Sequence, residues 1–136
     1  MSITITVKKL VAASQSGALA RYFDLDRPIQ VAWKNRKQFA TCTEELKLYN
    51  ERLVELCKKY GTQNPKNASA YDFDLGNPDV KPGEPGPQKK LFNAEFEKLE
   101  AMVLEDIPGD PVKVSETQGT LKVSDCELLD GSFLVD

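Results

Sequence analysis

The side chains of this chain that could perform acid–base chemistry are pairs of neighbouring carboxylates. A general acid and a general base must share one cleft and differ in pKa, and adjacent carboxylates on a solvated surface do not meet that condition. The pairs are Glu44/Glu45, Asp72/Asp74, Glu95/Glu97 and Glu105/Asp106. We interpret them as solvated side chains, and we assign no catalytic residue.

The sequence contains no histidine. Histidine is the commonest general base and metal ligand, so its absence removes Ser-His and Cys-His nucleophile pairs together. The three cysteines, Cys42, Cys57 and Cys126, lie far apart and lack the C-x-x-C spacing of zinc sites. We therefore predict a protein that is not an enzyme, that has no metal site and that resides in a reducing, cytosolic environment.

The segment from Asp72 to Asp79 superficially suggests a calcium loop. It lacks the central glycine and the closing bidentate glutamate of that motif, and Pro78 interrupts it. The glycines form neither a G-x-G-x-x-G nor a Walker A pattern. We interpret the segment as an acidic turn and predict no cofactor.

Charge and hydropathy limit the classes of partner. The 136 residues carry a net charge of −3, and the small basic clusters are mostly surrounded by acidic residues, so nucleic acid is not the expected partner. No stretch approaches the roughly 18 apolar residues of a membrane helix, and residues 1–9 do not resemble a signal peptide. We expect a single domain without a membrane partner.

The main structural pattern is a heptad repeat in the middle of the chain. Four heptads predict one long helix over residues 28–60, about 50 Å long, that must pack on another helix. Gly61 follows as the expected stop. The repeat consists of Ala32, Phe39, Leu46, Leu53 and Tyr60, with Cys42, Tyr49 and Leu56 between them.

Shorter elements flank this helix. Alternation of Ile3, Ile5 and Val7 predicts a strand, and a helix is expected over residues 8–23. A second long helix is predicted over residues 87–104, with Phe92, Phe96, Leu99 and Val103 on its apolar face, and it would pair antiparallel with the first. A small hairpin is expected over residues 112–123, and a short helix capped by Ser124 and ended by Gly131 follows. The predicted fold class is α+β, mainly α, with a long antiparallel helical hairpin, an N-terminal helix and a small β element near the termini.

A proline-rich segment over residues 62–88 separates the two long helices. Alternation of Tyr71, Phe73 and Leu75 with acidic residues predicts a short strand or extended arm there. Two interpretations remain open for this segment, a flexible connector and a binding arm. Two also remain open for Trp33, which is either packed in the core or exposed as an anchor for a partner.

Three segments resemble a loose group of uncharacterised proteins encoded by tailed bacteriophages. They are KNRKQFATCTEELKLYNERLVELCKKYG, FNAEFEKLEAMVLED and VKVSETQGTLKVSDCELLDG. The resemblance implies a phage origin, a non-enzymatic role and a location in the cytoplasm of the infected cell or in the virion. The proline-rich segment 78–87 departs from the group, where a charged hairpin is typical.

Two functions follow as hypotheses. The first is a protein-interaction or assembly protein that forms a homo-oligomer, since the long helix exceeds what the second helix can cover. The second is a small inhibitor of a host antiviral defence protein or of a nucleotide signal. Partners would be the chain itself, a host protein or a virion protein. The candidate interaction surface consists of Trp33, Phe39, Tyr71 and Phe73.

Overall fold

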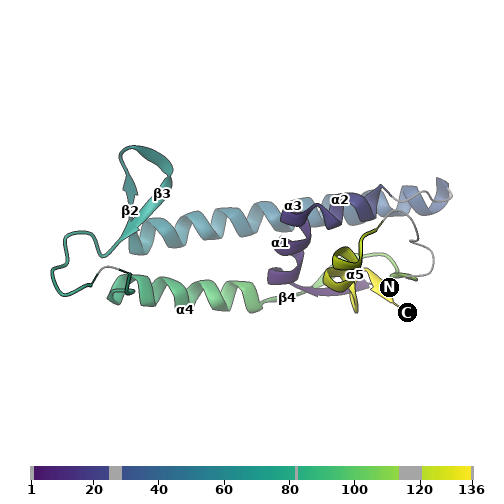
Figure 1. Cartoon of the computed structure of the whole chain (residues 1–136). Coiled ribbons are helices and arrows are strands. Elements are labelled where there is room, and N and C mark those ends of the chain that lie inside the picture. The colour runs from purple at the N-terminus through teal and green to yellow at the C-terminus, as the bar shows by residue number, and fades with distance from the viewer. Residues whose placement is uncertain (1, 25–28, 82, 114–120, 136) are drawn as a thin grey trace. The chain divides into compact units, whose positions relative to one another are not determined.

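The computed structural model describes residues 2–24, 29–81, 83–113 and 121–135 (Figure 1). The predicted α+β class with mainly helical content is confirmed. In chain order the elements are β1 (Ser2–Thr6), α1 (Val7–Ser16), α2 (Ala18–Phe23), α3 (Ile29–Tyr60), β2 (Gly61–Asn64), β3 (Asn67–Phe73), α4 (Pro87–Ala101), β4 (Val103–Pro108), β5 (Val112–Lys113), α5 (Val123–Leu129) and β6 (Leu134–Val135).

The contacts divide the chain into two compact units. Unit 1 comprises residues 1–47 and 101–136, and unit 2 comprises residues 48–100. The helix α3 begins in unit 1 and ends in unit 2. Each unit is described by itself below.

The first strand of unit 1 is confirmed. Its Ile3 and Ile5 are buried, and β1 pairs antiparallel with β4 (Figure 1). The strand β4 was not predicted, because Val103 was assigned to the apolar stripe of the preceding helix. That helix ends at Ala101, so its predicted end at residue 104 is wrong. Residues 103–108 form a strand because they pair with β1, and each strand supplies hydrogen-bond partners for the backbone N–H and C=O groups of the other.

The predicted single helix over residues 8–23 is two helices. Gly17 has a φ of 84°, which ends α1 and begins α2 in a new direction (Figure 1). This left-handed conformation costs glycine little and other residues much. The six residues expected on the buried face of this segment include Leu10, Val11, Ala18, Leu19 and Tyr22, which are buried. The sixth, Phe23, is only half-buried.

The C-terminal part of unit 1 differs from the expected hairpin. Instead, β5 pairs parallel with β6, and Val123 is the first residue of α5. The predicted segment from Val114 to residue 120 lies outside the described residues. The short helix itself is confirmed, but it is capped at Lys122 and not at Ser124. Phe133 and Leu134 are fully buried, although the sequence analysis assigned them to no helix or strand.

The long helix α3 ends at Tyr60, as predicted. Its predicted start at Pro28 lies outside the described residues, and so does the side chain of Ala32. Among the α3 side chains of unit 1 that the structure describes, Gln38 and Cys42 are buried, whereas the predicted core residue Phe39 is 52 % exposed. At about 100° per residue, Gln38 and Phe39 lie on opposite sides of Cys42, and the buried side is that of Gln38. The Nε2 of Gln38 donates a hydrogen bond to the carbonyl of Pro108 at 3.0 Å.

Unit 2 contains the end of α3, the β2–β3 hairpin and α4. The strand predicted around Tyr71 and Phe73 is confirmed as part of β3, which pairs antiparallel with β2. Tyr49 is buried, as predicted. The rings of Phe73 and Phe92 lie 4.7 Å apart, and Phe92 stacks on Phe96 at 5.8 Å. The hairpin is therefore anchored on α4 by an aromatic contact.

The start of α4 is capped by a residue from the preceding loop. Asp74 has a φ of 56°, and its carboxylate accepts backbone hydrogen bonds from Gln88 at 2.9 Å and Lys89 at 3.1 Å. Pro87 at the first helical position has no N–H to satisfy. The carboxylate thus supplies the partners that the first turn of a helix lacks.

Replacing Gly86 with alanine is expected to weaken this cap. A Cβ at position 86 would meet the Asp74 carboxylate directly and would lie 2.6 Å from Val80 Cγ2. We expect a loss of about 1–2 kcal/mol of stability, in the range of a lost helix cap, measurable by thermal or urea unfolding. As a control, the same substitution in an Asp74→Ala background should cost less, because the main obstacle is gone. Equal costs in both backgrounds would contradict this account.

Candidate functional site

The two predicted interaction residues of α3 are exposed. Trp33 is 62 % exposed, and the guanidinium of Arg36 lies 4.1 Å from the centre of its ring. Phe39 is half exposed, and its ring forms a T-shaped contact with the ring of Phe23, with 5.2 Å between the ring centres. Of the two alternatives for Trp33, a buried core position and an exposed position, the structure shows the exposed one.

The exposed side chains of α3 in unit 1 form a surface that we call the outer face. Each residue of a helix turns the side chain by about 100°, so Trp33 lies about 180° from the buried Cys42. Arg36 lies between the directions of Trp33 and Phe39. The outer face consists of the exposed residues Trp33, Arg36, Lys37, Phe39, Ala40, Thr43, Glu44 and Lys47.

The other two predicted residues belong to unit 2. Tyr71 and Phe73 are half-buried. The Phe73 ring packs on Phe92, and the ammonium of Lys89 lies 4.4 Å from the centre of the Phe73 ring. Phe73 therefore stabilises its own unit. The exposed apolar residue of this segment is Leu75, which is 71 % exposed.

The most buried charged group of the described chain is the carboxylate of Asp125. Arg21 donates to it twice, from Nε to Oδ2 at 2.6 Å and from Nη2 to Oδ1 at 2.7 Å. The backbone N–H of Lys122 donates a third hydrogen bond at 3.0 Å. The hydrogen bonds from Arg21 lower the pKa of Asp125 to about 2, against an opposing effect of burial. This pair joins α2 to α5 and has the geometry of a structural ion pair.

Two further carboxylates and the cysteines of the described residues have the following surroundings. The Asp74 carboxylate caps α4, and Glu95 lies 3.7 Å from the ammonium of Lys98. None of the three cysteines is in a disulfide, and burial raises the pKa of the Cys57 thiol. Within the described residues, no group of three or more Cys, Asp and Glu side chains is placed to hold a metal ion.

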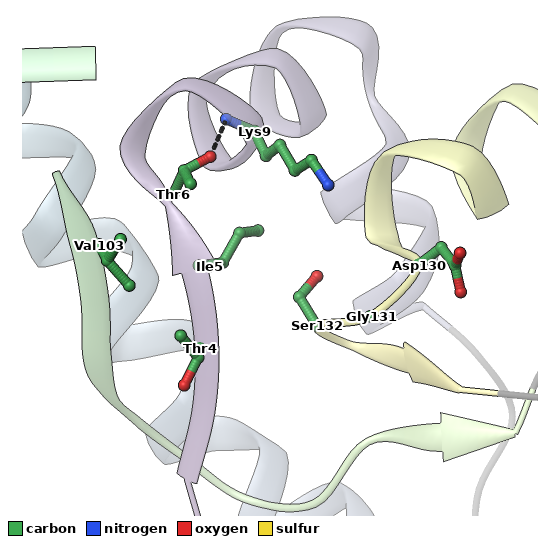
Figure 2. A pocket seen from close by; sticks show the side chains of 8 residues that line it. All are labelled: Thr4, Ile5, Thr6, Lys9, Val103, Asp130, Gly131 and Ser132. Atoms are coloured by element: carbon green, nitrogen blue, oxygen red, sulfur yellow. Dashed lines mark hydrogen bonds between the residues drawn. The ribbon is translucent and has the colours of Figure 1, made fainter. Parts of the chain in front are cut away.

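Sequence reasoning did not find a cavity of about 220 Å³ in unit 1. Figure 2 shows that the Lys9 side chain extends toward the space between β1 and the Gly131–Ser132 segment. The hydroxyl of Thr6 accepts from the backbone N–H of Lys9, and Ser132 Oγ donates to the carbonyl of Leu129. Its lining offers an ammonium and hydroxyls for a small polar molecule. The lining residues are Thr4, Ile5, Thr6, Lys9, Val103, Asp130, Gly131 and Ser132.

A second cavity, of about 270 Å³, lies in unit 2 beside the loop that precedes α4. The loop between Asn77 and Pro87 and the side chain of Lys90 line it. The acidic turn of the sequence therefore forms part of a polar loop that contributes the α4 cap.

In comparisons with protein-family models, curated proteins and solved structures, no match to this chain was found. Over the described residues, the helices are too short or too polar to cross a membrane.

Proposed function

We propose that this chain is a non-enzymatic, phage-encoded interaction or assembly protein that associates with itself through the outer face of α3. The observation that carries the proposal is the exposure of Trp33 beside Arg36. Tryptophan and arginine are the residue types most enriched at the energetic centres of protein interfaces. Such a side chain gains most when a partner removes it from water.

We also propose that the end of α3 and α4 form an antiparallel pair within unit 2, as the sequence predicts. The charge of Glu100, near the end of α4, acts on Tyr49 and raises its phenol pKa together with burial. The charge of Lys89, near the start of α4, acts on Cys57. Charges that act early-to-late and late-to-early along two helices are those expected of an antiparallel pair. An α4 partner would cover only the end of α3 and leave the outer face to another molecule.

The proposal predicts that Trp33→Ala weakens self-association. The loss of a central tryptophan typically costs about 2 kcal/mol, which is about thirtyfold in Kd. The measurement is the mass in solution by light scattering coupled to size exclusion, over a concentration series. Val123→Ala is the matched control, because Val123 is also in unit 1 and is 78 % exposed but lies on α5. A wild-type protein that stays monomeric throughout would refute self-association.

A second candidate function is inhibition of a host defence protein through the β2–β3 segment. The observation that favours it is the exposed Leu75 next to an ordered hairpin. Deleting the whole segment 62–88 would also remove the Phe73 contact and the Asp74 cap. The sharper test is Leu75→Ser, which should abolish binding of a host protein while the unfolding curve stays unchanged.

A further inference from the structure

The charges on the outer face are ordered along the helix. Arg36 and Lys37 lie toward its start, Glu44 follows Lys37 by one heptad, and Lys47 comes three residues after Glu44. All four side chains are exposed. The ion pairs found among the described residues, Arg21–Asp125 and Glu95–Lys98, do not involve them.

Lys37 and Glu44 cannot satisfy each other within one helix. Seven residues correspond to about 10 Å along the axis and about 20° around it, so both side chains point the same way from different turns. Ala40 lies between them, and it is exposed and small. A small residue at this position allows a second helix to approach closely.

We propose that the occupant of the outer face is α3 of a second copy of this chain, packed antiparallel about a two-fold axis between residues 40 and 41. In that arrangement Lys37 of each copy faces Glu44 of the other, which gives two symmetric ion pairs, as an isologous interface requires. Trp33 extends the contact by about one further turn on each side. This inference rests on the proposed self-association and adds its partner helix, direction and register.

Charge disfavours a parallel, in-register pair. A parallel, in-register pair would place Lys37 against Lys37 and Glu44 against Glu44, and like charges at an interface disfavour that pairing. The presence of Glu44 on the same face as the basic residues also disfavours a nucleic-acid backbone as the occupant.

The test uses the full chain with single charge reversals. Lys37→Glu and Glu44→Lys each place like charges in both pairs, and each should weaken the homodimer by at least about tenfold. The mixture of the two variants should restore the dimer as a heterodimer, because each copy then meets its opposite charge. The double variant K37E/E44K should also dimerise. The readout is mass by light scattering, with one variant enlarged by a tag so that the heterodimer has its own mass.

Matched controls are Lys8→Glu on α1 and Glu127→Lys on α5, which reverse exposed charges of unit 1 away from the outer face. Both should dimerise like the wild type. A wild-type dimer that neither single reversal weakens would overturn the register and leave the proposed function standing. Weakening without rescue in the mixture would overturn the antiparallel pairing. A monomeric wild type would overturn the proposed function and this inference with it.

Discussion

An Arg21→Ala variant is expected to lose about 3 kcal/mol of stability in unit 1. The substitution leaves the carboxylate of Asp125, which is 1 % exposed, without its bidentate partner. Breaking a buried pair by removing one member costs about 3–5 kcal/mol, and we take the lower end because Arg21 is about a third exposed. The measurement is urea unfolding monitored by circular dichroism.

The control is the double variant Arg21→Ala/Asp125→Asn. It removes the unpaired charge, so it should recover part of the lost stability. A double variant that is no more stable than Arg21→Ala would contradict the account.

The Arg21–Asp125 pair also makes the free energy of unfolding depend on pH. The pKa of Asp125 is lowered from 3.8 to about 2 in the folded chain. A lowered carboxyl pKa contributes stability above the unfolded value and loses it as the pH falls through the folded value. The stability difference between the wild type and the double variant should thus be full above pH 4 and shrink toward pH 2.

Phe133→Ala is expected to have a similarly large effect, although the residue lies close to the end of the sequence. Its ring is fully buried and lies 5.1 Å from Tyr22 and 6.2 Å from Phe23. Truncating a buried phenylalanine costs about 3–5 kcal/mol, because apolar area is lost and a cavity remains. Urea unfolding and the loss of near-ultraviolet circular dichroism would report it.

The conservative control is Phe133→Leu, which retains most of the apolar volume and should cost clearly less than the alanine. An alanine variant as stable as the wild type would mean that the terminal segment does not hold unit 1 together.

Local patterns were sufficient to predict the elements that local interactions determine. The end of α3 at Tyr60, the strand β1 and the short helix α5 follow from periodicity, β-branched alternation and stop residues. The break at Gly17 depends on where the following helix packs, which a local pattern does not determine. The extended segment at Val112 was predicted from local alternation, but its pairing with β6 was not. The strands β4 and β6 depend on pairing with distant segments, which no local pattern encodes.

The candidate site was predictable in part. The sequence singled out Trp33 but left its exposure open, since a heptad pattern alone does not determine which neighbouring position faces the core. Gln38 is an example: it is polar, but its side chain is buried and donates a hydrogen bond to the carbonyl of Pro108. Phe73 was singled out for binding, but its ring packs within its own unit, and only the fold of the hairpin onto α4 reveals that contact.

The position of Trp33 has an optical consequence. It is the only tryptophan of the chain, so excitation at the long-wavelength edge of the indole band, where tyrosine does not absorb, produces emission from one point on α3. The ring is open to water and close to a guanidinium, so the free chain emits as a hydrated indole. The protein therefore carries an intrinsic fluorescent label on its outer face, and the colour of its emission reports whether that face is covered.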